Sequence, residues 1–438
     1  MFFPHFLSSR KPAGNILWAG GYILFYDYIY RYYMYETFDY MGVEYNPMNL
    51  GKYFLFFIVA SFPLMAYRGF NSLAAGFSLL TYVLAYIPCI HALYVSNQLA
   101  WEIIFIYSCV FFVCMSSFFL TDKLYFLKKV YSQKTGRRLP FGFIESVTLL
   151  VVVLLLGVNI DRLQMVNLFT ESDTLYDLRA EFGDDRARWM KYLIQWLTTA
   201  FFPLLLICYL KNRSYLKYGM VMAGYLIVFM MDMQKITFFL PFVLTLVYFL
   251  PGKNRTGFLY YFHSGLIGAL IGISYLLYVY RDNLFVFALS GIFILRTQCI
   301  SGLLFTLYIH FFENHPYTYY THVNIVNWLT EAYPYTDVLG RAVSQGGMNA
   351  NATFWITDGL AAMGWSGIIV ISIIFIFFKS TLNSIECRYD RYDCFIIFLP
   401  AVSMMLNASL FTAVLSCGFL VLYLILRYVH IEILEIKR

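Results

Sequence analysis

The sequence predicts an all-α protein that crosses a membrane many times. Of its 438 residues, 61% are hydrophobic and only 13% are charged, whereas roughly a quarter of the residues are charged in an ordinary soluble domain. Apolar runs of span length recur along the whole chain, and about 20 residues per crossing helix leave room for about 12 crossings with loops between them. A soluble fold is therefore excluded, and we expect one polytopic membrane domain over residues 1–438.

The apolar runs place the expected spans in order along the chain. The first is weak because Asp27 interrupts it among tyrosines, and the last two could instead form one long tilted helix. Residues 1–10 lack the charged and apolar regions of a removable signal peptide. The spans lie near 15–33, 53–67, 72–93, 100–120, 142–160, 190–210, 216–232, 236–250, 257–280, 352–378, 394–408 and 410–428.

The basic residues orient the chain. The net charge is +6, from 31 Lys and Arg against 25 Asp and Glu, and with both termini in the cytoplasm most basic residues fall on the cytoplasmic side, as the positive-inside rule requires. No stretch of the sequence concentrates basic residues as a nucleic-acid-binding face would. The exceptions lie at or beyond the outer ends of the spans: Arg31, Lys52, Arg162, Arg179, Arg186, Arg188, Lys191, Lys235, Arg281, Arg296 and Arg341.

Two long loops, 161–189 and 281–351, are expected on the outer side. The inner loops are short apart from 121–141, so any chemistry belongs to the outer face or to a cavity that opens there. Residues 281–351 contain apolar stretches punctuated by charges, and we expect short interfacial or re-entrant helices in them, because irregular backbone cannot face lipid.

Four cationic residues near the outer face are candidates for an anion site: Arg179, Lys235, Arg281 and Arg296. Arginine stays charged in a low dielectric and presents a planar set of donors that suits phosphate oxygens. The ordinary alternatives are solvated ion pairs in the acidic loop around Arg179 and, for Lys235, a snorkelling side chain paired with Asp232.

Candidate acid–base and polar groups follow in the second loop. His315 belongs to a series with His310 and His322 near Glu313, and a histidine near an acid can accept a proton at neutral pH. These spacings match no standard zinc pattern, and the eight cysteines, mostly inside apolar runs, suggest neither a disulfide framework nor a metal site. We predict no metal and no cofactor.

The entry to the next span is polar. Asn349, Asn351 and Asp358 could present polar groups along its first turns, and an aspartate this close to a span requires a polar partner or water. The small residues that follow, Gly359 to Gly367, permit close helix packing, which is the structural alternative for this stretch.

With these segments in view, the sequence resembles the Wzy-type polymerases of bacterial O-antigen and capsule repeat units. The resemblance covers about two-thirds of the chain. Where many members carry a proline after the arginine that opens the apolar stretch, this chain continues from Arg296 without one. The similar segments are TLYDLRAEF, GYLIVFMMDMQKITFFLPF, LRTQCISGLLFTLYIHFFENHP and MNANATFWITDGLAAMGWSGI.

The resemblance implies a membrane-embedded glycosyltransferase of GT-C-like architecture in the bacterial inner membrane, multi-pass and active on the periplasmic face. Its substrate would be an oligosaccharide repeat unit on undecaprenyl pyrophosphate, and a chain-length regulator would be a protein partner. Arg179, Lys235, Arg281 and Arg296 would bind the donor pyrophosphate, while His315 or Asp358 would serve as base. Asn349 and Asn351 would complete the substrate contacts.

Two other functions stay open at this point. An O-antigen ligase shares the multispan layout and a large outer loop with Arg and His, so the site chemistry barely separates the two enzymes. A flippase or transporter of the lipid-linked unit would instead carry charges in the middle of several spans, whereas the middle spans here are nearly free of them.

Overall fold

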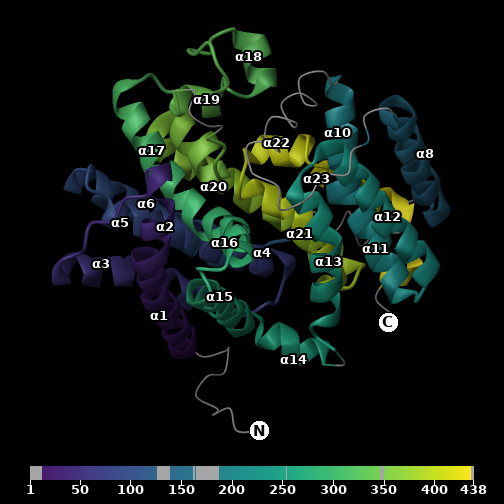
Figure 1. Ribbon diagram of the computed structural model, residues 1–438, viewed down its shortest axis with the longest axis horizontal. Coiled ribbons are helices and arrows are strands. Elements are labelled where there is room, and N and C mark those ends of the chain that lie inside the picture. Colours follow the sequence, from purple (N-terminus) through teal and green to yellow (C-terminus); the bar gives the residue numbers. More distant parts are fainter. Residues whose placement is uncertain are drawn as a thin grey trace. The chain divides into compact units, whose positions relative to one another are not determined.

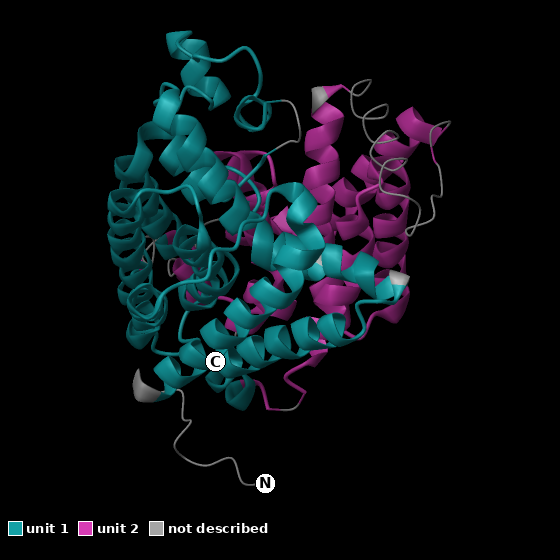
Figure 2. Cartoon of the chain, turned by 60° about the vertical axis from the view of Figure 1, so that its left-hand side comes forward, with its two compact units in different colours: residues 1–124, 256–380, 405–410 teal, residues 125–255, 381–404, 411–438 magenta. Residues whose placement is uncertain are grey.

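A computed structural model describes residues 12–125, 139–160, 163, 187–252, 254–345 and 350–435, and helices dominate it (Figure 1). Two short parallel strands accompany them, β1 (Leu139–Pro140) and β2 (Val429–His430). The predicted all-α class is thus confirmed. The chain forms two compact units: unit 1 holds residues 1–124, 256–380 and 405–410, and unit 2 holds the rest (Figure 2).

By length and composition, the described residues contain seven helices that could cross a membrane, which supports an integral membrane protein. Shorter apolar helices occupy three further stretches, Leu50–Ala66, Lys235–Phe249 and Phe419–Tyr428. The 12 predicted spans and the GT-C-like architecture stay predictions. The seven long helices are Leu73–Val95, Trp101–Leu120, Phe141–Asn159, Trp189–Lys211, Phe262–Val279, Phe285–Asn314 and Trp355–Cys387.

One of these helices lies within the predicted outer loop 281–351. Phe285–Asn314 runs for 30 residues and comprises three consecutive shorter helices, Leu284–Ser290, Gly291–Cys299 and Ile300–Asn314. Its second half packs closely on the helix of residues 87–95: a Cβ on Gly302 would lie 2.4 Å from the carbonyl oxygen of Pro88. Glycine at this position is therefore required by a close backbone approach.

Unit 1 contains all the helices that carry the site described below. In Figure 1, α18 and α19 follow α17 and lie near the top of the view, with α18 above α19. The elements of the first part are α1 (Pro12–Ile29), η2 (Tyr30–Met34), α2 (Tyr35–Phe38), η3 (Asp39–Met41), α3 (Leu50–Ser61), η4 (Phe62–Ala66), α4 (Leu73–Thr81), η5 (Tyr82–Tyr86), α5 (Ile87–Val95) and α6 (Trp101–Leu120). Those of the second part are α14 (Arg255–Tyr260), α15 (Phe262–Val279), α16 (Leu284–Ser290), η8 (Gly291–Cys299), α17 (Ile300–Asn314), α18 (Asn324–Thr330), α19 (Leu339–Val343), η9 (Trp355–Leu360) and α20 (Ala361–Asn383).

The polar entry to the last long helix forms a helical hairpin. Helical geometry breaks at Met363 and at Gly364, which has φ +62° and ψ −140°, a combination that favours glycine. Residues 355–362 therefore fold back on the rest of α20, and Trp355 Nε1 donates to Ser372 Oγ at 2.8 Å. A Cβ on Gly367 would lie 2.1 Å from the Gly359 carbonyl oxygen, so the small residues serve helix packing, as the structural alternative predicted.

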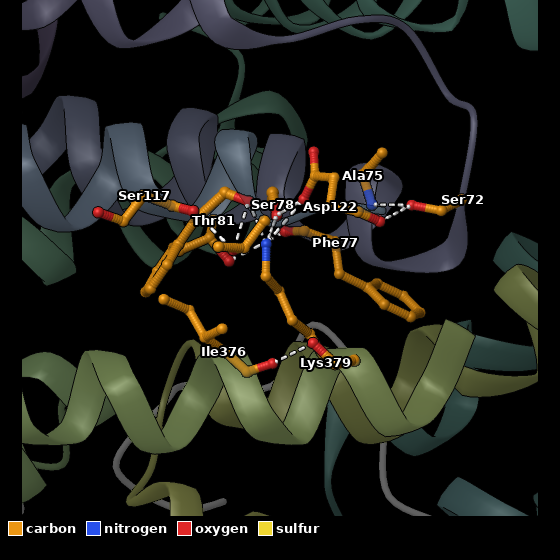
Figure 3. Close-up of polar contacts among 12 residues, drawn as sticks. Ser72, Ala75, Phe77, Ser78, Thr81, Ser117, Asp122, Ile376 and Lys379 are labelled. Atoms are coloured by element: carbon orange, nitrogen blue, oxygen red, sulfur yellow. Dashed lines mark hydrogen bonds and ion pairs between the residues drawn. The ribbon is translucent and has the colours of Figure 1, made fainter. Parts of the chain in front are cut away.

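A fully buried lysine joins three helices of unit 1. Lys379 Nζ donates to Ser78 Oγ at 3.1 Å and to Asp122 Oδ1 at 2.7 Å, and the Phe118 carbonyl accepts its third bond. Figure 3 shows the side chain reaching from α20 toward Ser78 and Asp122. All three ammonium protons are used within the protein, so this ion pair is structural, and removing one partner would leave a buried charge unpaired.

Unit 2 is a second helical unit with its own buried ion pairs. The Asp393 carboxylate is fully buried and lies 2.5 Å from Lys211 Nζ and 3.0 Å from Arg255 Nη1. Its strands are β1 and β2, and its helices are α8 (Phe141–Asn159), α10 (Arg188–Trp196), η7 (Leu197–Phe201), α11 (Phe202–Lys211), α12 (Tyr215–Asp232), α13 (Lys235–Phe249), η10 (Ser384–Cys387), α21 (Arg391–Met405), α22 (Leu410–Leu415), α23 (Phe419–Tyr428) and η11 (Glu432–Leu434).

Candidate functional site

Arg281, a predicted phosphate ligand, and Arg31 both contact Tyr32. Arg281 follows α15, and its Nη1 donates to the Tyr32 carbonyl oxygen at 3.1 Å. The Arg31 guanidinium lies over the Tyr32 ring, 4.9 Å from the centroid, a cation–π contact. Glu36 approaches Arg281 to 3.7 Å, with both side chains largely exposed. Two exposed guanidinium groups from α15 and η2 therefore lie beside one residue, open to an anionic ligand.

Arg296 lies on η8, which packs against η2, the short π-helix that carries Arg31. Hydrogen bonds fix η8 to both neighbouring helices: Tyr26 on α1 donates to the Gln298 carbonyl, and Gln298 Nε2 donates to Ser274 Oγ on α15 at 2.9 Å. The Arg296 side chain is exposed. Segments far apart in the sequence thus bring Arg31, Arg281 and Arg296 to one region of unit 1, called the arginine cluster below.

Sequence reasoning finds two members of the arginine cluster and treats the third only as an outer basic residue. Arg31 stands in the tyrosine-rich run at the end of a weak predicted span. Nothing in its spacing connects it with Arg281, because the Tyr32 contact joins residues 249 positions apart. The available signal is its place at the predicted outer end of a span, which it shares with Arg281.

His315, a predicted base, directly follows α17 and is exposed. Its Nδ1 lies 2.8 Å from the Phe311 carbonyl oxygen, and its ring stacks on the Phe311 ring at 4.0 Å between centroids. A carbonyl only accepts, so Nδ1 carries a proton, and in the neutral ring Nε2 then holds the lone pair. The ring is therefore oriented, and an accepting nitrogen is left for a ligand.

Asp358, the other predicted base, is completely buried. Its Oδ1 lies 3.2 Å from His322 Nε2, and its Oδ2 accepts from the Leu410 backbone N–H. His322 Nδ1 lies 2.8 Å from Thr318 Oγ1, and Thr318 donates through Oγ1 to the Ala361 carbonyl at 2.9 Å. Both carboxylate oxygens are thus engaged within the protein, and the network fastens the loop after α17 to the helical hairpin.

Donor counting fixes the protons in this network. The Thr318 hydroxyl proton goes to Ala361, so His322 Nδ1 must donate to Thr318. A further proton joins His322 Nε2 to the Asp358 carboxyl group, whose Oδ1 lies 3.2 Å away. Burial and the Asp358 charge raise the pKa of Tyr320 to about 12, so that neighbouring phenol stays neutral.

The two predicted bases lie away from Arg296. Arg296 precedes α17 and His315 follows it, and the 15 residues of that helix span about 20 Å at 1.5 Å per residue. Asp358 joins the His315 end through His322 and Thr318. A proton is transferred only over hydrogen-bond distance, so Arg296 and His315 do not serve one reacting centre in this conformation.

The remaining predicted contacts are dispersed. Lys235 is the first residue of α13 in unit 2 and is half-buried. Asp232 bonds to the Gln234 N–H and the Thr237 hydroxyl. Asn351 is exposed, just before the helical hairpin. Arg179 and Asn349 lie outside the described residues, so their roles and that of Lys235 stay predictions.

Neither a metal site nor a similar known protein points to the function of this chain. In the part of the chain that the structure describes, no group of three or more His, Cys, Asp or Glu side chains is arranged to hold a metal ion. Comparisons with protein-family models, with curated proteins and with solved structures found no match. The function is therefore argued from the residues of this chain.

Proposed function

We propose that this chain is a membrane-embedded glycosyltransferase of the Wzy type, which transfers a growing glycan from undecaprenyl pyrophosphate to a new lipid-linked repeat unit. The arginine cluster carries the proposal. Arg31 and Arg281 both contact Tyr32. Arg296 lies on the π-helix η8, which packs against η2, the element that contains Arg31 and Tyr32. Guanidinium groups match phosphate oxygens in geometry and keep their charge at a membrane surface.

The reaction makes two demands. The acceptor hydroxyl oxygen forms a bond to the anomeric carbon of the donor, the bond from that carbon to the pyrophosphate breaks, and the electron pair leaves with the pyrophosphate. The hydroxyl proton must pass to a base. The arginine cluster meets the first demand by stabilising the charge that develops on the leaving group, and this stabilisation needs no metal ion or cofactor.

The finer features of the proposal follow the resemblance. The protein would lie in the bacterial inner membrane with both termini in the cytoplasm, about 12 spans and a GT-C-like architecture, and would work at the periplasmic face, where a chain-length regulator would contact it. Lys235, Arg179, Asn349 and Asn351 would add contacts to the substrate.

His315 has a different part in this proposal from the one the sequence predicts. Its exposed Nε2 acceptor lies beside Phe311, whose ring is 5.5 Å from that of Tyr335. An aromatic surface with an adjacent hydrogen-bond acceptor suits the apolar face and hydroxyls of a sugar. At about 28 Å from Arg296 along η8 and α17, from 1.5 Å per residue, His315 would bind the glycan away from the pyrophosphate, and Asp358 would hold the loop that carries it.

Complementation of a strain that lacks the gene tests the function. The wild-type gene should restore a ladder of polymer lengths, and Arg281→Ala and Arg296→Ala should leave single repeat units at normal protein levels. Arg341→Ala is the matched control, because Arg341 is exposed on α19, outside the cluster.

The phenotype separates the alternatives. A strain that makes only bare lipid core without the gene would indicate a ligase, and one that retains repeat units on the cytoplasmic side would indicate a flippase. Full ladders from both arginine variants would contradict the role given to the cluster.

A further inference from the structure

A carboxylate lies one helical turn before Arg31. Asp27 is on α1, and residues four positions apart lie on the same side of a helix. Its Oδ1 is 2.8 Å from His91 Nε2 on α5. The Asp27 side chain is 16% exposed, whereas the His91 side chain is completely buried, so the carboxylate is accessible at one edge and supported from behind by the imidazole.

The His91 ring is held in an aromatic enclosure. The ring centroids of Tyr26, Tyr30 and Phe56 lie 5.0, 4.4 and 5.5 Å from that of the imidazole. Tyr26 and Tyr30 are themselves fixed, since their hydroxyls donate to the backbone carbonyls of Gln298 and Glu44. The imidazole therefore has little freedom to turn away from Asp27.

One atom of this pair lacks a hydrogen bond. His91 Nδ1 is buried and has no partner among the described residues. An unprotonated Nδ1 leaves only a lone pair without a partner, and the ring proton then sits on Nε2 and is donated to Asp27. Because an unsatisfied buried polar atom destabilises a fold, a buried apolar residue would be the more stable choice, and stability alone does not account for histidine here.

Asp27 borders the arginine cluster. Arg31 follows Asp27 by four positions, about one helical turn, and its guanidinium lies 5.9 Å from the centroid of the Tyr45 ring. Arg31 also shares Tyr32 with Arg281. A partly accessible carboxylate and the cationic groups assigned to the leaving group therefore adjoin each other.

We propose that Asp27 is the catalytic base of the glycosyl transfer and that His91 is its positioning residue. The inference rests on the proposed function. Asp27 Oδ2 takes the proton of the acceptor hydroxyl as that oxygen bonds to the anomeric carbon, and the electron pair of the broken bond leaves with the pyrophosphate. The His91 Nε2–H bond to Oδ1 keeps the other carboxylate oxygen turned toward the acceptor.

Polymer synthesis by purified protein in detergent tests the proposal, with the lipid-linked repeat unit as substrate. General acid–base catalysis contributes about 10²- to 10⁴-fold, so Asp27→Asn should lower kcat by that factor and leave KM and the unfolding temperature nearly unchanged. Asp39→Asn is the matched control, because Asp39 is an exposed acid 12 positions further along the same segment. A second variant, Asp27→Gly, should recover activity when formate or azide is added as an external base.

The positioning role of His91 is tested by a measurement that a purely structural role would not affect. His91→Gln keeps a donor for Asp27 and should retain more activity than His91→Leu, which should lower kcat about 10- to 100-fold through misplacement of the base at an unchanged KM. Equal activity of these two variants would contradict the positioning role.

The outcomes separate the inference from the proposed function. If wild-type protein makes polymer, Arg281→Ala does not and Asp27→Asn does at more than half the wild-type rate, the base assignment is overturned while the function stands. If wild-type protein makes no polymer, both are overturned. Loss in Asp27→Asn with recovery of Asp27→Gly by formate supports both.

Discussion

Two of the carboxylate–histidine pairs in unit 1, Asp358–His322 and Asp27–His91, join distant parts of the chain and differ in their surroundings. Asp358 and His322 use every polar atom of the pair: Leu410 occupies one carboxylate oxygen, and Thr318 occupies the far imidazole nitrogen. Asp27 and His91 do not, since the described residues offer His91 Nδ1 no partner and the Asp27 carboxylate is partly exposed.

The difference indicates different uses of the same pairing. A saturated pair, in which every polar atom is hydrogen-bonded, stabilises the arrangement of the segments that it joins, and Asp358–His322 joins a loop to a helical hairpin. An unsaturated pair, here Asp27–His91, costs stability but leaves a carboxylate oxygen for a reaction. The resemblance implies His315 or Asp358 as the base, whereas the exposure of the two carboxylates favours Asp27 over Asp358.

The largest expected effect separates the two pairs by activity. Asp27→Asn should reduce polymer formation about 10²- to 10⁴-fold with little change in the unfolding temperature. Asp358→Asn should instead lower the unfolding temperature, and its activity should fall only as far as the folded fraction does. Paired thermal melts and rate measurements on the two proteins would check this, and the reverse assignment of effects would contradict the comparison.

Removal of one partner from the saturated pair should produce the next effect. His322→Leu leaves the buried Asp358 carboxyl group without its imidazole partner, and we expect a loss of about 3–5 kcal/mol in the free energy of unfolding. Denaturant unfolding in detergent micelles measures it. His310→Leu is the control, because it removes an imidazole from a more exposed pair: His310 Nδ1 lies 3.4 Å from the Glu313 carboxylate, and these side chains are 35% and 36% exposed. A loss as small as that of the control would show that the pair contributes little.

A smaller change would make the saturated pair resemble the unsaturated one. Thr318→Val keeps the shape of the side chain but removes the hydroxyl that bonds to His322 and Ala361. Leaving a buried polar partner unsatisfied should cost about 1–3 kcal/mol. Thr318→Ser keeps the hydroxyl and should recover most of the loss, and equal stability of the two variants would be the contrary result.

The smallest expected effect on stability belongs to His91. His91→Leu removes Nδ1, for which the described residues offer no partner, together with the bond to Asp27, whose side chain is 16% exposed, so the free energy of unfolding should fall by only about 1 kcal/mol. A thermal melt beside His322→Leu would show the contrast. A loss equal to that of His322→Leu would mean that both pairs are structural.

Part of this arrangement could be predicted from the sequence. Apolar content and span-length runs determine a helical membrane protein, because a backbone in lipid must satisfy its own hydrogen bonds. Arg281 and Arg296 stand out because a charge beside an apolar segment costs free energy unless a partner or a ligand compensates it. Within residues 281–351, Arg296 interrupts the hydropathy of the helical run Phe285–Asn314, so the sequence predicts its short helices but not their continuity.

The base candidates could not be chosen from the sequence. His91 lies inside an apolar run and Asp27 inside a weak span, 64 positions away, and no local spacing connects them. The resemblance implies His315 or Asp358 as the base, yet the helical run between Arg296 and His315 separates these two residues by about 28 Å, and the hairpin encloses Asp358.

The sequence by itself determined the class of the molecule, the candidate cations and the chemistry that they favour, because hydrophobicity and charge are properties of residues and of their local order. Only the tertiary structure decided which carboxylate is saturated and which is accessible. Hydrogen-bond satisfaction depends on contacts such as those of Asp358 with Leu410 and of Asp27 with His91, and these contacts form between segments distant in the chain when the helices pack.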